Sequence, residues 1–334
     1  MELGVLSIVI VSYNTRELLQ GCLRSLGENS GLVMTSGAKY QVPGNNGTGD
    51  NPMLDTGSPT PIPTQVVVVD NASSDGSAEM VAAGFPHVEL VKSEKNLGFA
   101  RATNVGLSRC RGNWLLLLNP DTEVIGNALV EMIEFLSTHP GVAAVGPALQ
   151  YPDGSPQHAA FRFPTLWMTF LDLFPLNHRL LNSKLNGRYG TPPDLRPFPI
   201  DHPLGAAIMI RRKALEEVGV LDESFFMYCE EVDWSIRARR LGWEIFQVPE
   251  ARIVHYAGQS TEQFRDAMTV ELWRSRYLLY AKHYPSRFIQ VHRIILRAGL
   301  AKSIATARLD AYRGRITASE FERRLRAYQA IWSM

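Results

Sequence analysis

Short apolar runs without polar alternation recur along the chain, and each ends abruptly in small or polar residues. In the clearest run, four consecutive leucines at 115–118 are followed by Asn119-Pro120-Asp121. A strand that is buried on both faces of a parallel sheet has this composition. We therefore predict buried strands at 6–11, 65–69, 87–91, 115–118 and 142–145.

Between these runs, apolar residues recur at helical spacing, most clearly over 18–26 and 129–136. Asn14 and Glu17 have the spacing of a capping box, so we expect Asn14 to cap the first helix. Strands that alternate with helices predict an α/β fold with a mostly parallel, doubly wound sheet and helices on both faces. The glycine fingerprint of dinucleotide-binding folds and the phosphate loop of nucleotide triphosphatases are both missing.

Two stretches fall outside this alternation. Residues 28–64 are rich in Gly, Pro, Asn, Thr and Ser, and we interpret them as a long flexible insertion, either disordered without a role or acting as a lid. From residue 262 the pattern is helical to the end, with another capping box at Thr317 and Glu320. We therefore expect an α/β domain at 1–260 with an insertion at 28–64, and a helical C-terminal extension at 261–334.

The second half of the chain continues the pattern less regularly. Residues 151–199 are rich in Pro and aromatic residues and predict no clear element. After them we predict a strand at 205–210, a helix at 212–218, a helix that follows the aromatic cluster at 225–228, and two last strands at 243–248 and 252–256.

Composition limits the class of protein. The 334 residues are 45% hydrophobic and 20% charged, which is typical of a globular protein, and a net charge of +1 argues against a nucleic-acid binder. Cys22, Cys110 and Cys229 are far apart and lie in apolar or helical patterns, so we expect reduced core cysteines in a cytoplasmic protein. We expect neither a signal peptide nor a membrane-spanning helix.

Asp121 is the first candidate for chemistry. In open α/β sheets the ligand crevice lies beyond the carboxyl ends of the strands, which is where Asp121 should sit. A carboxylate there can hold a divalent metal against a diphosphate. Asn119-Pro120-Asp121 could equally form only a turn, because these residue types favour turns.

Three acids, Glu230, Glu231 and Asp233, follow the aromatic cluster 225–228. The positive end of a helix dipole explains one or two of them. Glu230 and Asp233 are three apart and should share a helical face, whereas Glu231 should point elsewhere. An apolar wall at 225–228 would desolvate Glu231 and raise its pKa, so we predict Glu231 as a general base.

Seven motifs occur in one order over roughly residues 5–260. They are Ile10-Val11-Ser12-Tyr13-Asn14, the Asp-, Asn- and Ser-rich stretch 69–77, Asn96-Leu97-Gly98-Phe99-Ala100, Asn119-Pro120-Asp121-Thr122, Gly205-Ala206-Ala207, the stretch 226–234, and Val254-His255. This ordered set resembles the inverting glycosyltransferases of family 2, which have the GT-A fold, and most closely their rhamnosyltransferase-like branch.

The resemblance implies a nucleotide-sugar site. Asp70 would accept from the base N–H, and Lys95 or Arg101 would lie near the diphosphate. The full set implied for the nucleotide-sugar is Ser12, Tyr13, Asn14, Asp70, Asn71, Ser73, Lys95, Asn96, Gly98, Arg101, Asn104, Asn119 and Asp121.

The resemblance also implies a metal and an acceptor side. Asp121 and His255 would hold Mn²⁺ or Mg²⁺, although Asn119 replaces the first acid of the family's Asp-x-Asp motif. Glu231 matches the catalytic-base position, where the family usually has Asp. The acceptor side would include Gly205, Ala206, Glu230, Asp233 and Trp234.

Two other functions are compatible with such a fold. A sugar nucleotidyltransferase would need a glycine-rich loop after the first strand, and residues 12–16 lack glycine. A catalytically inactive scaffold that binds nucleotide-sugars would fit a chain without Asp121 or the acidic cluster, and both are present.

The expected partners are a nucleotide-diphosphate sugar, with deoxythymidine-diphosphate rhamnose as our choice, and a glycan or lipid-linked acceptor. Residues 287–334 contain ten Lys plus Arg and three acids. Arg287, Arg293 and Arg297 alternate with apolar residues such as Phe288 and Ile294, so the basic helices could rest on the inner face of the cytoplasmic membrane. A solvated face on a helix packed against the catalytic domain explains the pattern equally well.

Overall fold

One large sheet organises the chain as far as residue 255. The structure is a computed structural model that describes residues 4–28, 31–35, 61–257 and 265–334. The sheet contains β1 (Leu6–Ser12), β2 (Leu32–Met34), β3 (Ile62–Asp70), β4 (Glu89–Lys92), β5 (Trp114–Leu118), β6 (Thr122–Val124), β7 (Val142–Gln150), β8 (Pro156–Gln157), β10 (Phe198–Pro199), β12 (Ala207–Arg211) and β13 (Glu244–His255). A separate short pair is formed by β9 (Ala160–Phe161) and β11 (His202–Pro203).

The centre of the sheet is parallel, as predicted. β1 lies between β3 and β5, with Ile8 opposite both Val66 and Leu116. β2 and β4 also pair with β3 in parallel. The residues of β1 and β5 are buried throughout, because helices cover both faces and leave no place for polar alternation.

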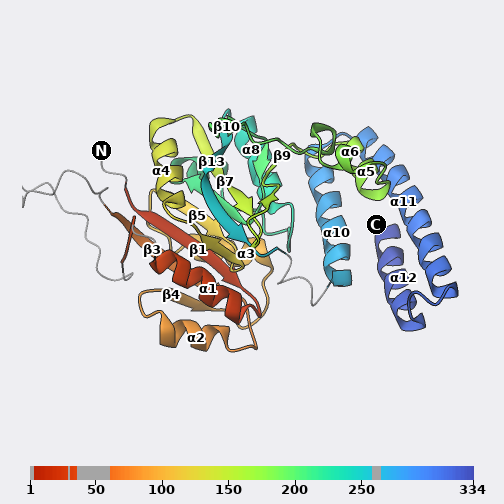
Figure 1. Cartoon of the computed structure of the whole chain (residues 1–334), viewed down its shortest axis with the longest axis horizontal. Helices are drawn as coiled ribbons and strands as arrows, with labels where there is room; N and C mark the ends of the chain where they lie inside the picture. Colours follow the sequence, from red (N-terminus) through yellow and green to blue (C-terminus); the bar gives the residue numbers. More distant parts are fainter. Residues whose placement is uncertain (1–3, 29–30, 36–60, 258–264) are drawn as a thin grey trace, which may run out of the picture.

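Successive residues of the central strands point to opposite faces of the sheet. Ile8 and Ile10 pack against α1 (Arg16–Gly27), α2 (Ser77–Gly84) and α4 (Ala128–Thr138). Val9 and Val11 pack toward α3 (Phe99–Leu107), α7 (Arg212–Val218) and α8 (Glu230–Arg240). The doubly wound arrangement is therefore confirmed (Figure 1).

The other half of the sheet is mixed. β12 lies antiparallel between β5 and β7, and β13 is parallel to β7. The prediction of two strands at 243–248 and 252–256 was wrong, because both belong to β13. A register shift between Val248 and Arg252 lets this one strand continue along β7.

Of the two predicted helix starts, the first is wrong and the second is confirmed. α1 begins at Arg16 after Thr15, and Asn14 does not cap it. Asn14 instead has a φ of 53°, and its Oδ1 accepts from the N–H of Ser74 at 2.8 Å. The predicted cap at Thr317 is confirmed, since its hydroxyl accepts from the N–H of Glu320 at 3.1 Å.

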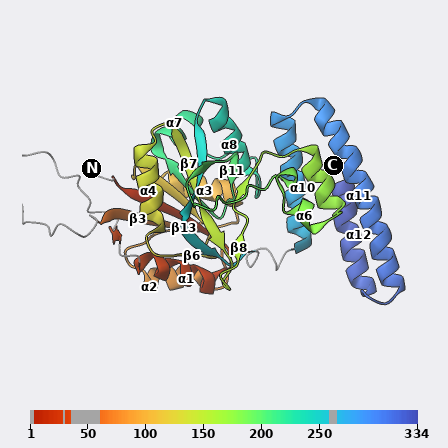
Figure 2. The same cartoon turned by 45° about the horizontal axis from the view of Figure 1, so that its top comes forward.

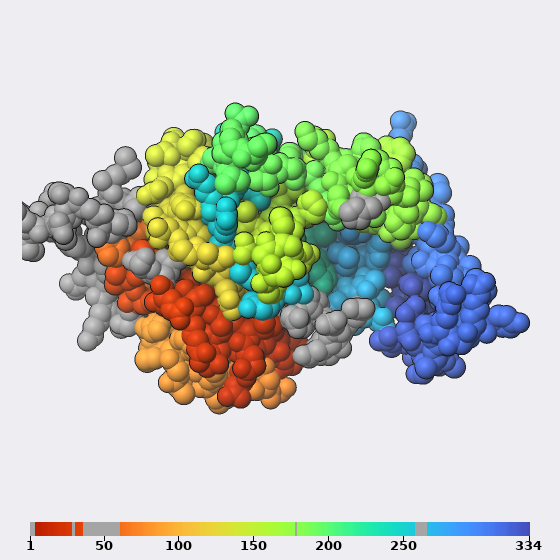
Figure 3. Space-filling view, in the orientation of Figure 1, coloured from red at the N-terminus to blue at the C-terminus, as the bar shows by residue number. Residues whose placement is uncertain are grey.

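A group of helices lies beside the sheet (Figure 2). It contains α10 (Arg265–His283), α11 (Ser286–Tyr312) and α12 (Ala318–Trp332), together with α5 (Leu166–Leu173), α6 (His178–Leu181) and the 3-10 turn η1 (Lys184–Asn186). α5 packs on α11 at Gly299, where a Cβ atom would lie 2.7 Å from the Cβ of Leu173. The space-filling view shows the segment around α5 against the C-terminal helices (Figure 3). The helical part thus includes a segment from within 1–260, and the division at residue 260 stays a prediction.

Part of the predicted insertion at 28–64 is ordered. β2 and the start of β3 fall within 28–64, so the ends of the predicted insertion are strands, while residues 36–60 lie outside the described residues. The three cysteines are buried and free, as predicted. In the described part of the chain, no helix is both long and apolar enough to cross a membrane.

Candidate functional site

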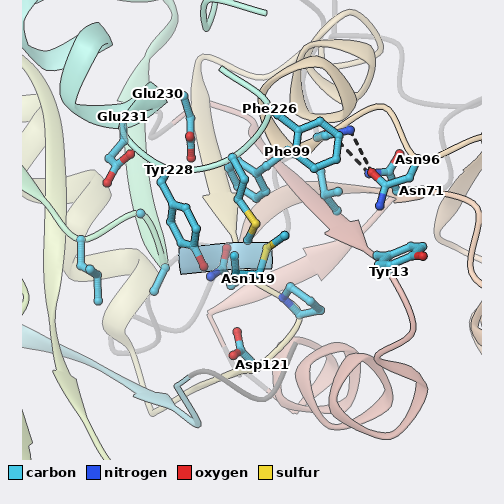
Figure 4. A pocket seen from close by; sticks show the side chains of 18 of the residues that line it. Tyr13, Asn71, Asn96, Phe99, Asn119, Asp121, Phe226, Tyr228, Glu230 and Glu231 are labelled. Carbon is cyan, nitrogen blue, oxygen red and sulfur yellow. Dashed lines mark hydrogen bonds between the residues drawn. The ribbon is translucent and has the colours of Figure 1, made fainter. Parts of the chain in front are cut away.

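A cavity of about 370 Å³ opens at one edge of the sheet (Figure 4). The loops after β1, β3 and β5 reach it because these strands are parallel and end at the same edge. β12 runs the other way, so its amino end brings Gly205 and Ala206 to this edge too. The lining residues are Val11, Tyr13, Asn71, Asn96, Gly98, Phe99, Asn119, Pro120, Asp121, Leu204, Gly205, Ala206, Phe226, Met227, Tyr228, Glu230, Glu231, His255 and Met268.

The loops after β1 and β3 are hydrogen-bonded to each other. The N–H of Asn14 donates to the Oγ of Ser73 at 3.0 Å, and the Asn14 side chain accepts from Ser74. Ala72 has a φ of 68° in the same region. Left-handed backbone at residues other than glycine costs free energy and persists only where the surroundings impose it. This edge of the cavity is therefore shaped before a ligand arrives.

Asp70 has one carboxylate oxygen in use and one free. Its Oδ2 accepts from the N–H of Ser73 at 3.2 Å, while its buried Oδ1 has no hydrogen-bond partner. A buried acceptor without a donor is costly. The free oxygen suits a ligand N–H, although Asp70 does not itself line the cavity.

Gly98 and Phe226, which both line the cavity, are in direct contact. The N–H of Phe99 donates to the carbonyl of Phe226 at 2.6 Å. Gly98 has a φ of 81°, and a Cβ there would lie 2.5 Å from that carbonyl oxygen. Beside it, the Asn71 amide donates to the Oδ1 of Asn96 at 2.9 Å. Glycine is therefore required at residue 98.

Asp121 and His255 meet on the floor of the cavity. β13 ends at the same edge as β5, and His255 pairs with Thr122 of β6, which places it next to Asp121. The Nε2 of His255 lies 3.5 Å from the Oδ1 of Asp121, and that buried oxygen accepts no hydrogen bond. Carboxylate oxygen and imidazole nitrogen both bind Mn²⁺, so these two atoms fit a divalent cation.

The protein offers few further ligands for such a cation. Among the described residues, no group of three or more His, Cys, Asp or Glu could hold a metal ion. Mg²⁺ in phosphate-transfer sites is commonly held by one or two carboxylates, with substrate phosphates completing its shell. A cation here would therefore need oxygen atoms from a bound ligand.

Glu230 and Glu231 enter the cavity from the opposite side to Tyr13, Asn71 and Asn96 (Figure 4). Glu230 is buried and Glu231 is partly buried, and each has a buried Oε2 atom without a hydrogen-bond partner. The chain reaches them through Tyr228 and Cys229, whose φ angles are 70° and 66°. Two successive left-handed residues store strain at the point where the acids are presented.

Burial changes the acidity of this pair. It raises the pKa of Glu231 to about 7. Burial also raises the pKa of Glu230 well above its ordinary value, and the neighbouring charge of Glu231 adds to the effect. A carboxyl group whose pKa lies near neutrality can take a proton from a hydroxyl and release it again. The pKa of Glu231 suits that task.

Comparison with known proteins decides what kind of cavity this is. The family model for Glycosyl transferase family 2 matches residues 7–219, which is more than half of the chain. The chain belongs to glycosyltransferase family 2. The resemblance inferred from the motifs is confirmed, and the family sets aside the sugar nucleotidyltransferase.

Individual proteins that are similar to this chain are also named as glycosyltransferases. This glycosyltransferase is 28% identical over 252 residues to the N-acetylglucosaminyl-diphospho-decaprenol L-rhamnosyltransferase of Mycobacterium tuberculosis (strain ATCC 25618 / H37Rv), covering 72% of this chain and 81% of the relative. It is 27% identical over 219 residues to the low-salt glycan biosynthesis hexosyltransferase Agl10 of Haloferax volcanii, covering 64% and 66%.

A solved structure supports the fold. The mannosyltransferase PcManGT of Pyrobaculum calidifontis, solved with GDP-Man and Mn²⁺, superposes with a TM-score of 0.54 at 15% identity, covering 98% of this chain and 85% of that one. The expected GT-A fold is therefore confirmed. Glu231 and His255 lie beyond the residues that the family model matches, so their roles rest on the geometry.

Asp233 and Trp234 of this glycosyltransferase were expected on the acceptor side, and neither lines the cavity. Asp233 is fully buried and accepts from Arg237, Lys282 and His283 at 2.6–2.8 Å. Burial acts to raise the pKa of Asp233, but these hydrogen bonds prevail and lower it. Trp234 donates from its ring to the carbonyl of Gly219 at 2.9 Å.

Glu230 was expected to share a helical face with Asp233, and it enters the cavity with Glu231 instead. Glu230 is the first residue of α8, so no preceding helical turn directs its side chain. Its position follows from the left-handed turn at Cys229.

Other residues expected at the nucleotide-sugar also lie outside the lining. Arg101 forms an exposed ion pair with Glu223 at 3.7 Å, and Lys95 is exposed. The Asn104 amide donates to the carbonyl of Leu221 at 2.8 Å and holds two segments of the fold together. Ser12 contacts Thr15 through its hydroxyl at 3.0 Å. No Lys or Arg of the described residues lines the cavity.

The structure adds lining residues that the sequence did not single out. Met268 reaches the cavity from α10, outside the predicted α/β domain. The hydroxyl of Ser275, on the same helix, donates to the carbonyl of Met227 at 2.7 Å. No motif around Met268 or Ser275 could have indicated this contact, because it depends on how α10 docks. Phe226, Met227 and Tyr228 line the cavity, whereas Phe225 is in the core.

Proposed function

We propose that this family 2 enzyme transfers rhamnose, with inversion, from deoxythymidine-diphosphate rhamnose to a sugar carried on a lipid diphosphate. The similarity to the mycobacterial rhamnosyltransferase, whose name states a diphospho-decaprenol acceptor, supports this choice. The cavity, with polar groups on one side and two carboxyl groups on the other, supports a donor and an acceptor that meet in it.

The donor would occupy the edge formed by the loops after β1 and β3. Asp70 would accept from the base through its free Oδ1, and Tyr13, Asn71 and Asn96 would border the nucleotide. Gly98 would let the donor approach the backbone closely. Ser12, Asn14 and Ser73 would act indirectly, by fixing the two loops.

Asp121 Oδ1 and His255 Nε2 would hold Mn²⁺ or Mg²⁺ together with the donor diphosphate. When bound, the cation neutralises charge on the leaving diphosphate. The absence of Lys and Arg from the described lining supports a cation in this role. Asn119 would leave Asp121 as the one carboxylate of the motif.

Glu231 would be the general base. The acceptor hydroxyl oxygen attacks the anomeric carbon, the bond from that carbon to the diphosphate oxygen breaks, and the hydroxyl proton passes to the Glu231 carboxylate. One direct displacement inverts the configuration. Glu230 would lie beside it, and since burial raises the pKa of this carboxyl well above its ordinary value, its protonated form could donate to the acceptor. Gly205 leaves room there, since a Cβ would lie 3.5 Å from the Glu231 carboxyl carbon.

We also propose that one face of α11 rests on an anionic membrane surface. Val291 and Ile294 are separated from Leu309 and Tyr312 by 18 residues, or five turns, so these four side chains share a face. All four are exposed, Ile294 to 69% and Tyr312 to 90%. Exposed arginines at 287, 297 and 308 flank this face.

The face differs from the one that the sequence suggested. Phe288 packs against the core, so of the two apolar residues named in the sequence analysis only Ile294 points outward. The neighbouring Ile289 also packs against the core, and Leu296 is buried. Asp310 is the one acid within α11, and it pairs with Arg315. An apolar stripe between cations suits an interfacial helix.

Vesicle co-sedimentation tests the membrane proposal. Ile294→Asp should lower binding to phosphatidylglycerol vesicles by about tenfold or more, because burying an isoleucine contributes roughly 2 kcal/mol. Val220→Asp, at a residue exposed to 48% on the sheet domain, is the control and should bind normally. Equal binding by both variants and the wild type would contradict the proposal.

A panel of nucleotide-sugars tests the donor. Deoxythymidine-diphosphate rhamnose with Mn²⁺ should raise the melting temperature most, because a ligand that binds the folded state stabilises it by mass action. Transfer to N-acetylglucosaminyl diphosphate on a short prenyl chain should follow. A larger shift with another sugar nucleotide, together with no transfer from the rhamnose donor, would show that the donor is not deoxythymidine-diphosphate rhamnose.

A further inference from the structure

The imidazole of His255 is contacted through both of its nitrogen atoms. Its Nδ1 lies 2.8 Å from the Oε1 of Gln157, and its Nε2 lies 3.5 Å from the Oδ1 of Asp121. The His255 side chain is only 9% exposed. The protein therefore surrounds this ring with one neutral oxygen and one carboxylate oxygen.

The contact with Gln157 fixes where the ring proton lies. The amide oxygen of glutamine accepts hydrogen bonds and cannot donate them. The Nδ1 atom must therefore carry the proton that is shared with Gln157. In a neutral imidazole, the lone pair is then on Nε2, on the side of Asp121.

This tautomer leaves two electron-pair donors facing each other. Neither Nε2 of His255 nor the unpartnered Oδ1 of Asp121 has a proton to share across the 3.5 Å that separates them. Ligand atoms bind Mg²⁺ at about 2.1 Å, so both atoms can reach one cation of that size. In the opposite tautomer, an Nε2 proton would point at Asp121 and block such a cation.

We infer that Gln157 is a positioning residue, which holds His255 as the Nδ1–H tautomer so that Nε2 and Asp121 can share a divalent cation. This inference rests on the metal site proposed above. It adds to the site a residue that lies outside the cavity lining and acts through His255 alone.

The sheet explains how Gln157 comes to this place. Gln157 in β8 pairs with Leu149 of β7, and Leu149 pairs on its other side with Ile253 of β13. His255 is two residues beyond Ile253, so its side chain is on the same face of the sheet as that of Ile253. Gln157 thus reaches His255 across the end of β7.

Two variants separate the proton acceptor from the size of the side chain. Gln157→Glu keeps an oxygen acceptor at the same reach, whereas Gln157→Met keeps the length without an acceptor. The first readout is the imidazole ¹⁵N spectrum of metal-free protein at pH 8, with His255→Asn used to identify the His255 signals. Wild type and Gln157→Glu should show the Nδ1–H tautomer. Gln157→Met should shift to Nε2–H, because that proton can then reach Asp121.

The second readout is Mn²⁺ affinity, measured by the electron paramagnetic resonance of free Mn²⁺ with deoxythymidine diphosphate as the probe. Gln157→Met should bind Mn²⁺ about 10- to 100-fold more weakly, as expected for the loss of an outer hydrogen bond to a metal ligand. Gln157→Glu should restore the affinity. Nucleotide binding without metal should be the same in all three proteins.

Two results overturn the inference in different ways. An Nε2–H signal in the wild type, or full Mn²⁺ affinity in Gln157→Met, would show that Gln157 does not set the tautomer that binds metal. Unchanged Mn²⁺ affinity in His255→Asn would instead remove the proposed metal site, and the inference with it.

Discussion

The Oδ1 of Asp233 lies 2.7 Å from the Nε2 of His283, fifty residues further along the chain. Lys282 donates to the same oxygen at 2.6 Å, so α8 is tied to the end of α10. The same α10 contributes Met268 to the cavity and holds the loop at Met227 through Ser275. The C-terminal helices therefore take part in building the site.

Asp233→Asn should destabilise the enzyme by about 3 kcal/mol, because it leaves buried donors without their charged partner. Urea unfolding measures the loss. Glu322→Gln, which removes an exposed ion pair with Arg326, is the control and should cost less than about 1 kcal/mol. If Asp233→Asn loses no more free energy of unfolding than the control, the contacts of Asp233 with α10 contribute little to stability.

The contacts of Asp233 with Lys282 and His283 also predict that the fold loses stability in acid. Hydrogen bonding lowers the folded-state pKa of Asp233 below its unfolded value of about 3.8. A lowered pKa stabilises the fold above the unfolded pKa, and the stabilisation disappears as the pH falls through the folded value. Wild type should therefore lose more stability than Asp233→Asn between pH 4 and pH 2. Parallel melting curves over this range would contradict the assignment.

Glu230 should affect stability in the opposite direction. Burial raises its folded-state pKa, so the charged form costs free energy and stability falls as the pH rises from 4.5 through the folded pKa. Glu230→Gln should raise the melting temperature at pH 8 by roughly 2 °C or more, and by less at pH 5. The exposed Glu216→Gln should change neither value. A lower melting temperature of Glu230→Gln than of wild type at pH 8 would contradict a destabilising burial of Glu230.

Much of the fold could be predicted from the sequence, because burial on both faces leaves a plain pattern. For that reason the run at 115–118 is uniformly apolar, and the run at 6–11 is apolar except for Ser7. The antiparallel direction of β12 could not be predicted, since an apolar run does not carry a direction. Nor could the sequence distinguish one bulged strand from two at β13.

The candidate site was predictable where a side chain follows a strand closely. Asp121, Asn71 and Tyr13 line the cavity because strand ends fix them. Asn104 follows no strand, and its polar side chain holds Leu221 instead of lining the cavity. Gln157 was missed because its importance depends on a pairing across β7 that the sequence does not show.

Chelation tests the metal. Excess EDTA should abolish transfer, and Mn²⁺ should restore it. Asp121→Asn, which removes the charge and keeps the size, should lose more than about 100-fold in kcat, since a cation at a leaving diphosphate contributes several kcal/mol. Glu123→Gln, whose carboxylate accepts from Tyr256 instead of facing the cavity, is the control and should keep most of its activity. Full transfer in EDTA would contradict a metal role.

The rate should depend on pH through Glu231. Burial raises the pKa of this carboxyl to about 7, and only its deprotonated form accepts a proton. The value of kcat should therefore rise with pH and level off above pH 8. Steady-state rates between pH 5.5 and 8.5, at saturating donor and acceptor, give the profile. A flat profile would mean that proton transfer to Glu231 does not limit the rate.

The most direct measurement is single-turnover transfer by Glu231→Gln, from deoxythymidine-diphosphate rhamnose to N-acetylglucosaminyl diphosphate on a short prenyl chain. Removal of a general base should slow transfer by about 10²- to 10⁴-fold. The Kd for the donor should stay within about twofold of wild type, because Glu231 lies across the cavity from Tyr13, Asn71 and Asn96, where we propose that the donor binds. Glu216→Gln should transfer at the wild-type rate. Near wild-type turnover in Glu231→Gln, with both substrates saturating, would contradict the assignment of Glu231 as the base.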